Sequence, residues 1–418
     1  MKHLQNLLIL FAVFVLVPSS TLPAGDWPQY RGPKQDGIST ESLKLKWGPK
    51  GPPLVWTTKT NTGFSSFTVC EGRVFTQVVR DIDGRPREVC LALDADTGKE
   101  LWVADIGLGK GYSGGGPGDG PRSTPTINDG LVYLFSPDMV VYCVDAATGK
   151  PVWKRDLIEQ NKGRNIKWRS AASVVIDGDL VFVGGGGPGQ SLLALDKKTG
   201  RVVWKAHDVR VTHSTPIVAT IHGQRQVIFF LQSGLLSVNA DNGKKLWHFE
   251  FPFNVSTAIT PLVCGDIVYC SAGYGVGGAA CRITKRAGLF KAQELWYISG
   301  NKQVANHWST PIYKDGHLYG IFCFKKFKTG PLKCVELTTG KVKWEEPGFG
   351  QGNVTLAGDR LLALTDYGDL VLVEATPNKY EELSRFKALN GKCWSTPTLS
   401  NGRIYVRSTT EGKCFEVK

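Results

Sequence analysis

An eleven-residue pattern recurs along the chain, and this repeat constrains the fold more than any other feature. Five copies align without gaps: ALDADTGKELW ending at Trp102, CVDAATGKPVW at Trp153, ALDKKTGRVVW at Trp204, SVNADNGKKLW at Trp247 and CVELTTGKVKW at Trp344. Two copies are degenerate, RITKRAGLFKAQELW ending at Trp296 and VLVEATPNKYEEL ending at Leu383, and PPLVWTTK with Trp56 supplies an eighth ending. Such repetition indicates an array of similar units that bury their apolar faces against one another.

Each copy predicts a β-hairpin. An apolar strand leads into Asp, then Thr-Gly or Asn-Gly makes a tight turn because glycine tolerates a positive φ, and a second strand carries the Trp. Another hairpin with alternating apolar residues lies between successive copies. Its turns are Glu71-Gly72, Asp129-Gly130, Asp177-Gly178, His222-Gly223, Gly265-Asp266, Asp315-Gly316, Gly358-Asp359 and Asn401-Gly402. Two hairpins per unit make four strands, and the turns and the Trp-type endings both number eight.

The two ends of the chain indicate that the units close into a ring. The last unit, WSTPTLSNGRIYVRSTTEGKCFEVK, holds enough residues for three strands, and residues 54–59 can supply the missing Trp strand. A closed ring leaves only short, protected sheet edges. We therefore predict an all-β fold, a single eight-bladed β-propeller of four-stranded antiparallel blades. It covers residues 54–418 and is closed by pairing of residues 54–59 with the C-terminal blade.

Residues 1–24 have the features of a secretory signal peptide. Lys2 gives a basic start, Leu7–Val17 is an apolar run too short to span a bilayer, and Ala24 ends a plausible cleavage site. No cysteine precedes Cys70, so the site of a lipid anchor is missing, and no later segment is long enough to cross a membrane. These features predict an exported protein, periplasmic or secreted, that is not a lipoprotein.

Net charge and cysteine content say less about the function than the repeat says about the fold. The formal net charge is +13, but the Lys and Arg residues are scattered without a basic tract, which argues against nucleic acid as a partner. Cys143 and Cys334 occupy a repeat position where other copies carry Ala or Ser, so a small buried side chain suffices there. Cys323 with Cys334, or Cys393 with Cys414, are candidate disulfides, and the sequence leaves the connectivity open.

The segment DWPQYRGPKQDGIS, residues 26–39, precedes the strand that closes the ring. Domain termini are usually loosely held, yet this one is rich in aromatic residues and proline. We interpret residues 25–53 as an N-terminal strap whose Trp27 and Tyr30 pack, largely buried, near the join of the first and last blades.

The AxDxxTGKxxW repeat resembles the tryptophan-docking motif of the pyrroloquinoline quinone (PQQ) dehydrogenases and of the wider PQQ-like repeat family. The resemblance covers nearly the whole mature chain, and DWPQYRG followed by PPLVW is similar to the N-terminal stretch of those dehydrogenases. The sequence is also similar to that of the eight-bladed lipoprotein that assists outer-membrane barrel assembly. The resemblance implies a propeller fold. Function must be argued from the site, since one fold supports many functions.

In a propeller, the loops that lead into the innermost strands converge on one face of the central channel. Here these loops bring together basic, aromatic and amide side chains, and the predicted ligand-contacting residues among them are Arg122, Trp168, Arg169, His213, Asn306, Trp308 and Trp394. Phe64, Asn254, His307, Asn353 and Lys392 lie in the same loops. Such a funnel suits a flat or anionic ligand. The alternative is that the Ser, Thr and Trp residues only shape and fill the channel mouth.

The residues that quinone catalysis needs are largely missing. The resemblance implies a calcium ion held by oxygen ligands and a carboxylate base, and Arg122 falls where the family places a cofactor-contacting Arg. The best alignment, however, puts Phe64 and Gly185 at the positions of the family's two Glu residues. Adjacent cysteines do not occur, and the funnel loops contain no Asp or Glu. We predict no catalytic residue and no metal site, and leave PQQ open only as a possible ligand.

The sequence thus predicts an exported PQQ-like propeller that acts as a non-catalytic binding or scaffolding module. Its expected partner is an envelope or extracellular protein, or an anionic small ligand in the funnel, and we expect a monomer. The alternative function is a divergent PQQ-dependent quinoprotein oxidoreductase without the usual calcium site.

Overall fold

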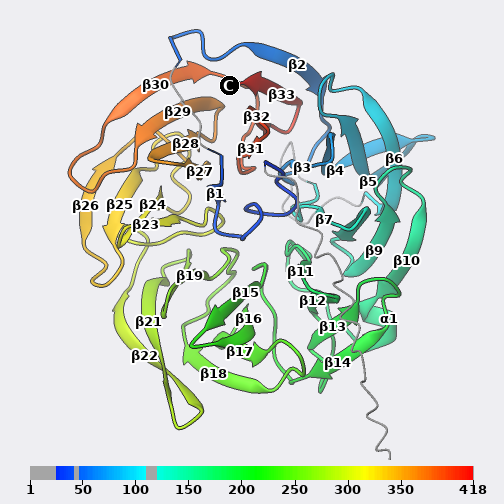
Figure 1. Ribbon diagram of the computed structural model, residues 1–418, viewed down its shortest axis with the longest axis vertical. Coiled ribbons are helices and arrows are strands. Elements are labelled where there is room, and N and C mark those ends of the chain that lie inside the picture. Colours follow the sequence, from blue (N-terminus) through cyan, green and yellow to red (C-terminus); the bar gives the residue numbers. More distant parts are fainter. Residues whose placement is uncertain (1–24, 42–46, 110–119, 418) are drawn as a thin grey trace, which may run out of the picture.

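Eight sheets surround a central axis (Figure 1) in the computed structural model, which describes residues 25–41, 47–109 and 120–417. Seven sheets have four strands, and the seventh in chain order carries a fifth. Neighbouring strands within each blade pair antiparallel, so the predicted eight-bladed β-propeller is confirmed. The predicted signal peptide, residues 1–24, lies outside the described residues.

We number the blades in chain order. Blade 1 contains β3 (Thr68–Cys70), β4 (Arg73–Ile82), β5 (Arg85–Asp94) and β6 (Glu100–Leu108), and blade 2 contains β7 (Thr126–Asn128), β8 (Leu131–Phe135), β9 (Val140–Asp145) and β10 (Pro151–Asp156). Blade 3 contains β11 (Val175–Asp177), β12 (Leu180–Gly184), β13 (Leu192–Asp196) and β14 (Val202–Ala206). Blade 4 contains β15 (Ile217–Ile221), β16 (Gln224–Leu231), β17 (Gly234–Asn239) and β18 (Lys245–Glu250). Blade 5 contains β19 (Leu262–Cys264), β20 (Ile267–Ala272), β21 (Gly277–Arg286) and β22 (Leu289–Ile298), and blade 6 contains β23 (Ile312–Lys314), β24 (His317–Ile321), β25 (Leu332–Glu336) and β26 (Val342–Glu346). Blade 7 contains β27 (Asn353–Ala357), β28 (Arg360–Leu364), β29 (Asp369–Glu374) and β30 (Glu382–Lys387). Blade 8 contains β31 (Thr398–Ser400), β32 (Arg403–Arg407) and β33 (Glu411–Glu416) together with β2 (Leu54–Lys59).

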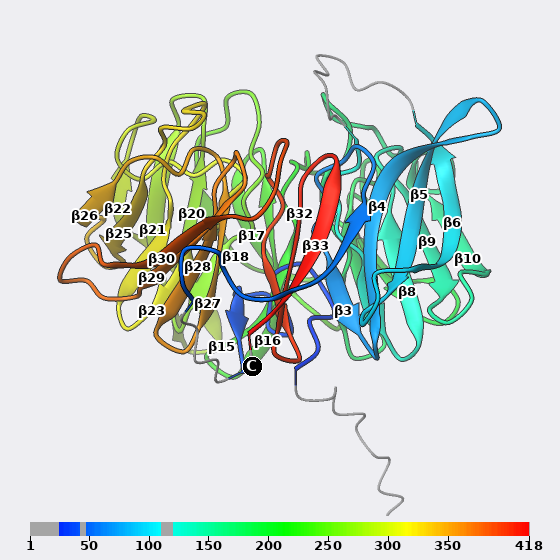
Figure 2. The same ribbon diagram turned by 90° about the horizontal axis from the view of Figure 1, so that it is seen from above.

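Blade 8 is built from both ends of the chain. Strand β2 pairs antiparallel with β33, where Trp56 lies opposite Cys414. Figure 2 shows the two strands side by side at the front of the ring. Because the outer strand of the last blade comes from the start of the propeller, opening the ring would require breaking this pairing.

The tryptophans of the repeat link each blade to the next. The indole nitrogen of Trp102 donates a hydrogen bond of 3.1 Å to the Ala146 carbonyl at the turn of blade 2. Equivalent bonds join Trp56 to Ala95, Trp153 to Lys197, Trp204 to Ala240, Trp296 to Leu337 and Trp344 to Thr376. Trp247 differs and donates to Gln226 within its own blade. In the blade that follows, the long strands β21 and β22 meet at Ala287-Gly288, so the Asp-Thr-Gly turn that accepts a tryptophan elsewhere is missing.

A small side chain lies opposite each docking tryptophan. The outer strands carry a β-bulge next to the tryptophan, and Trp102, Trp153 and Trp344 pair across the sheet with Ala92, Cys143 and Cys334. All ten cysteines are buried free thiols, so neither candidate disulfide is formed. Burial raises the pKa of the Cys143 thiol to about 12. The cysteines at these positions therefore serve as small core side chains.

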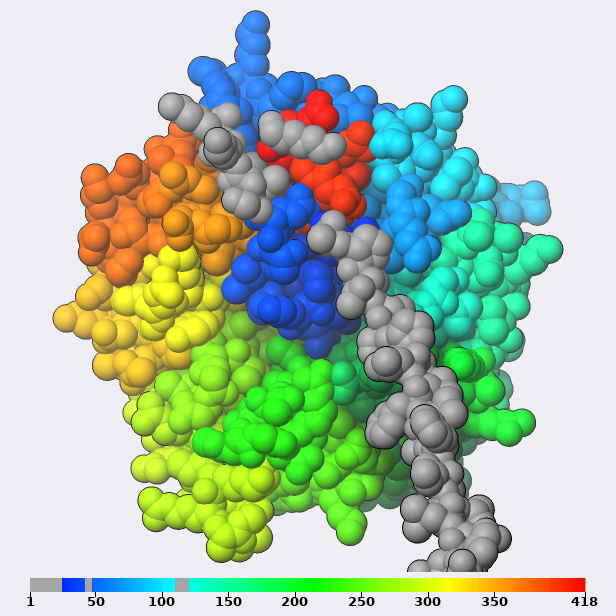
Figure 3. Space-filling view, in the orientation of Figure 1, coloured from blue at the N-terminus to red at the C-terminus, as the bar shows by residue number. Residues whose placement is uncertain are grey.

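The strap enters at the join of blades 8 and 1. Trp27 is 2% exposed and exchanges backbone hydrogen bonds of 2.8 and 2.9 Å with Val69 of β3, so its predicted burial is confirmed. From there the strap leaves the join and runs across the axis, where Figure 3 shows the N-terminal residues filling the centre of this face.

Contacts on the far side of the axis hold the strap across the channel. Arg31 is 2% exposed and its guanidinium donates to the Thr310 and Pro311 carbonyls of blade 6 at 2.7 and 2.8 Å. β1 (Ile38–Ser39) then pairs in parallel with β27 of blade 7. The strap therefore links blade 1 to blades 6 and 7 and closes one end of the channel.

The described residues contain one α-helix, α1 (Leu157–Asn161), which follows β10. Within these ranges, no helix has both the length and the apolar composition needed to cross a membrane.

Candidate functional site

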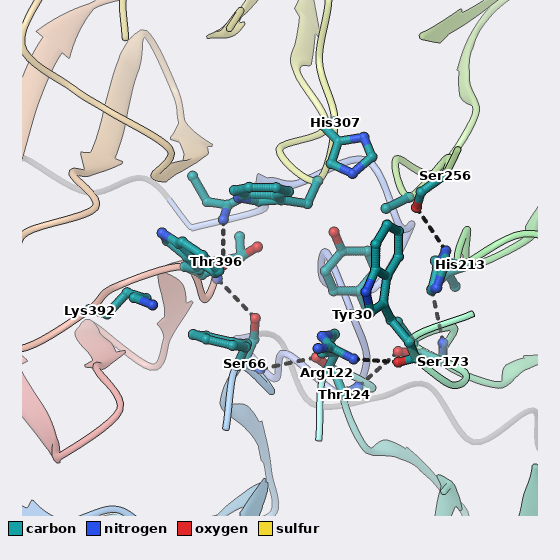
Figure 4. A pocket seen from close by; sticks show the side chains of 18 of the residues that line it. Tyr30, Ser66, Arg122, Thr124, Ser173, His213, Ser256, His307, Lys392 and Thr396 are labelled. Atoms are coloured by element: carbon teal, nitrogen blue, oxygen red, sulfur yellow. Dashed lines mark hydrogen bonds between the residues drawn. The ribbon is translucent and has the colours of Figure 1, made fainter. Parts of the chain in front are cut away.

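A cavity of about 410 Å³ lies at the centre of the ring. Each blade contributes side chains to it, mostly from the loop that leads into its innermost strand, and the strap contributes Tyr30. Figure 4 shows Tyr30 in the middle of these side chains. Since the strap crosses the channel, the cavity is a pocket with a floor.

The structure brings most of the predicted residues to this pocket. Five of the seven predicted ligand-contacting residues line it: Arg122, Trp168, His213, Trp308 and Trp394. Phe64, His307, Asn353 and Lys392, from the same set of loops, line it as well. The rule that these loops converge on the channel therefore places most of the lining correctly.

Arg169 and Asn306 lie elsewhere. Trp168 and Arg169 both have a positive φ, 63° and 65°, and Arg169 forms an ion pair with Asp138 instead of lining the pocket. Asn306 is fully buried, where it accepts from the Tyr269 hydroxyl at 2.6 Å and donates to the Ile321 carbonyl. It is a structural link of blades 5 and 6. Asn254 is exposed and also lies outside the pocket.

Four of the aromatic and basic residues that line the pocket were not predicted from the sequence: Tyr30, Tyr274, Lys325 and Phe327. Tyr30 was expected to be buried at the blade join, but it is half-buried in the pocket because Arg31 draws the strap across the axis. Tyr274 comes from the Gly-rich loop after β20. Lys325 and Phe327 belong to CFKKFKTG between β24 and β25, and the basic and aromatic residues of that loop were the available signal.

Aromatic rings form one wall of the pocket. Trp394 is stacked on Phe64, with centroids 4.7 Å apart and planes at 27°, and it lies 4.8 Å from Trp308. Phe327, which is 51% exposed, is nearly parallel to Trp394 at 5.9 Å. Such a wall offers apolar surface to a flat group.

Cationic side chains lie at the edge of this wall. The Lys392 ammonium is 4.5 Å from the centre of the Trp394 ring, and that of Lys325 is 5.1 Å from the Tyr274 ring. Arg122 donates a hydrogen bond of 2.8 Å to the Trp168 carbonyl and also lines the pocket. No lining residue in the described part of the chain is an Asp or a Glu. The electrostatic field of the pocket therefore favours an anion.

The two histidines are neutral in the folded protein near pH 7. Burial lowers the pKa of His213 to about 4, and the charge of Arg122 acts in the same direction. Burial, together with His213 and Lys325, lowers the pKa of His307 to about 3. His213 contacts the Lys167 carbonyl through Nε2 and the Ser256 hydroxyl through Nδ1, both at 2.9 Å. The proton of His213 is therefore on Nε2, and the ring is held in place by two neighbours.

The residues present do not fit a calcium-assisted quinone site. Calcium takes oxygen ligands, usually including carboxylates, and the lining offers amide and hydroxyl oxygens beside three cationic groups. Phe64, at one of the missing Glu positions, belongs to the aromatic wall. At the other, Gly185 has φ 126° and an added Cβ would lie 2.1 Å from the end of Met139. A glutamate at this position would require Met139 to move and would have a strained backbone conformation. Among the described residues, no group of three or more His, Cys, Asp or Glu is arranged to hold a metal.

Known proteins with the same fold include assembly factors and dehydrogenases. The outer membrane protein assembly factor BamB of Shewanella oneidensis is 26% identical over 309 residues, which cover 70% of this chain and 73% of that protein. The quinoprotein alcohol dehydrogenase PedH of Pseudomonas putida is 32% identical over 142 residues, but these cover 32% of this chain and 24% of that enzyme.

Solved structures give the same picture of the fold. BamB from Moraxella catarrhalis superposes with a TM-score of 0.61 at 16% identity, covering 87% of this chain and 97% of that one. The quinohemoprotein alcohol dehydrogenase of Comamonas testosteroni superposes with a TM-score of 0.65 at 14% identity, covering 94% of this chain and 80% of that one. The family model described as "Outer membrane protein assembly factor BamB" matches residues 86–319, more than half of the chain. The chain therefore belongs to this family of PQQ-like β-propellers.

Proposed function

We propose that this propeller is a non-catalytic binding or scaffolding module of the cell envelope, and that its central pocket holds an anionic group of a partner protein or of a small ligand. The observation that carries the proposal is the lining itself. Lys325, Lys392 and Arg122 stand beside an aromatic wall, and no Asp or Glu of the described residues lines the pocket with them.

The relatives support the binding role over the enzymatic one. Similarity to proteins named outer membrane protein assembly factors extends over about 70% of both chains, whereas the dehydrogenase PedH matches less than a third of its own length. Assembly factors act on other proteins in the cell envelope, so this similarity supports an envelope location and a protein partner. Export by residues 1–24, the absence of a lipid anchor and a monomeric state remain predictions from the sequence.

A pair of ligands that differ only in charge tests the proposal. Naphthalene-2-carboxylate and its neutral carboxamide have the same flat ring, so a difference in their dissociation constants, measured by titration calorimetry, reports the electrostatic part of binding. We expect the acid to bind at least tenfold more tightly, since one partly desolvated charge pair is worth about 1–2 kcal/mol.

Matched lysine variants show whether the preference for the acid comes from the charges of the pocket. Lys325→Gln with Lys392→Gln removes two charges from the pocket edge, and we expect it to abolish the preference for the acid. Lys150→Gln with Lys198→Gln removes two charges from exposed turns on the rim and should leave the preference unchanged. Equal binding of acid and amide by the wild-type protein would refute the proposal. Turnover with PQQ would favour the alternative, a divergent quinoprotein oxidoreductase.

A further inference from the structure

Blade 5 departs from the repeat in its outer hairpin. Strands β21 and β22 have ten residues each, whereas β17 and β18 of blade 4 have six each. Figure 1 shows the β21–β22 hairpin extending beyond the rim of the ring. Arg286 and Leu289 form its last pair, and Ala287 and Gly288, with φ 48° and 79°, make the turn. Residues 282–293 include four cations and no Asp or Glu.

One face of this hairpin packs against blade 4. Nε2 of His222, in the turn between β15 and β16, donates to the carbonyl of the buried Ile283 at 2.7 Å. The Lys285 ammonium donates to the His222 carbonyl at 3.3 Å and lies 5.0 Å from the centre of the Phe290 ring. Phe290 itself packs against the buried core shared by blades 4 and 5. These contacts hold the hairpin in place and use its Lys285 within the fold.

The opposite face is turned to solvent and carries cations around one leucine. Arg286 lies opposite Leu289, and Lys291 follows Leu289 by two residues on the same strand, so the three side chains share one face. Leu289 is 77% exposed, more than any other large apolar side chain of the described residues. Arg282, further from the turn, forms an ion pair with Asp266 at 3.5 Å. Within the described part of the chain, no carboxylate forms such a pair with Arg286 or Lys291. We call Arg286, Leu289 and Lys291 the hairpin tip.

A leucine flanked by cations is the complement of an anionic lipid surface. Cations are attracted to the phosphate groups of such a surface, and an apolar side chain enters the boundary between headgroups and acyl chains. A protein partner is a poorer match, because a stable protein interface buries about 800 Å² on each side. Three side chains at the end of a hairpin supply far less area than that.

We propose that the hairpin tip is a membrane contact, in which Leu289 enters the headgroup region of an anionic bilayer while Arg286 and Lys291 bind lipid phosphates. The contact is weak and salt-sensitive, because only two cations and one leucine carry it. The hairpin tip shares no residue with the central pocket, so this proposal and the proposed function stand or fall separately.

Sedimentation with lipid vesicles measures the contact. The protein is used without the predicted signal peptide, residues 1–24, because the apolar run of that segment would itself bind lipid. The vesicles contain either phosphatidylcholine alone, which has no net charge, or phosphatidylcholine mixed with phosphatidylglycerol, which is anionic. We expect binding to the anionic vesicles only. Binding should be lost when the salt rises from ~0.1 to ~1 M, because the Debye length then falls from about 10 to about 3 Å.

Variants of the hairpin tip separate the charges from the leucine. Arg286→Gln with Lys291→Gln should lower the partition coefficient for anionic vesicles at least about tenfold, because two attractions to the lipid surface are lost. Leu289→Ser should lower it about fivefold, because less apolar surface is buried in the interface. All three side chains are exposed, so the variants should keep the melting temperature of the wild type.

The controls change equivalent side chains elsewhere. Lys150→Gln with Lys198→Gln removes two charges from the corresponding turns of blades 2 and 3, and Leu101→Ser removes a leucine of β6 that is 48% exposed. Both should bind vesicles like the wild type. No binding of the wild type to anionic vesicles, or tip variants that bind like their controls, would overturn the membrane contact. If soluble poly-L-glutamate releases the protein from the vesicles and Leu289→Ser binds normally, the hairpin tip recognises acidic protein chains and the membrane contact is wrong.

Discussion

Buried neutral histidines make the pocket a pH-sensitive part of the molecule. His213 and His307 are buried among aromatic rings and cations, and no described carboxylate lines the pocket with them, so protonating either one puts an uncompensated charge in a buried site. Above pH 6.5 both are neutral in the folded and unfolded chains. The cationic character of the pocket near pH 7 therefore comes from Arg122 and the two lysines, and not from the histidines.

Acidification should destabilise the fold through His213. The pKa of His213 is about 4 in the folded protein, below the ordinary value of 6.5 that holds in the unfolded chain. The unfolded state then takes up the proton first, so stability is greatest above pH 6.5 and falls as the pH drops towards 4. Between pH 7 and 5 this linkage amounts to about 2 kcal/mol. Urea denaturation at the two pH values measures it.

The variant His213→Gln can keep the bond to the Lys167 carbonyl but cannot take up a proton. Its loss of stability between pH 7 and 5 should be smaller than that of the wild-type protein by about the same 2 kcal/mol. Identical pH dependence of the two proteins would show that His213 does not titrate as described.

The recurring element of the fold is a turn onto which a tryptophan of the preceding blade docks. At Gly149 the backbone has φ 69°, and an added Cβ would lie 2.7 Å from the Trp102 ring. Gly130, in the other hairpin turn of blade 2, has φ 71°, and no atom lies within 4 Å of the position that an added Cβ would take. The two glycines therefore share a backbone conformation, and only Gly149 is also required by packing.

This pair separates backbone strain from tryptophan docking. Gly130→Ala should cost about 1–2 kcal/mol, the penalty of a left-handed conformation for alanine. Gly149→Ala should cost at least ~1 kcal/mol more, because Trp102 must move away from its bond with Ala146. Denaturant unfolding of the two variants gives both values. Equal destabilisation would mean that the close approach of Trp102 contributes nothing.

The sequence predicts the arrangement of strands and hairpins well. The Asp-Thr-Gly and Trp spacing predicted the hairpins and the blade count, and the alignment of the repeats predicted a small buried side chain at the position of Cys143 and Cys334, because these features depend on contacts between neighbouring strands. The pocket was predictable as far as the loops before the innermost strands place it. The structure places Arg169 and Asn306 outside the pocket, because their partners, Asp138 and Tyr269, lie on other loops and strands. Lys325 and Phe327 come from a loop outside the repeat, so the repeat could not locate them.

At the scale of the whole molecule, the strap joins blades that are distant in the ring. It contacts blade 1 through Trp27, blade 6 through Arg31 and blade 7 through β1. No local pattern predicts such a path, because it depends on carbonyl groups nearly 280 residues away in the chain, those of Thr310 and Pro311. The strap therefore stabilises the ring and at the same time forms the pocket floor.

Deleting Asp26–Pro33 tests this structural role. The deletion removes the buried Trp27 and the four carbonyl contacts of Arg31, so we expect the melting temperature to fall by about 5 °C or more. Tyr30→Phe serves as the control because its hydroxyl makes no bond within the described protein, and its melting temperature should match the wild type. A deletion variant with unchanged stability that no longer binds the naphthalene probes would show that the strap serves the ligand and not the ring.

Binding of an anion through the charges of the pocket is the function that we propose for the whole molecule. The most direct test is the ratio of the dissociation constants of naphthalene-2-carboxamide and naphthalene-2-carboxylate for the wild-type protein at pH 7. We expect a ratio of at least about ten, which the Lys325→Gln, Lys392→Gln double variant reduces to about one. A ratio near one for the wild-type protein would contradict it.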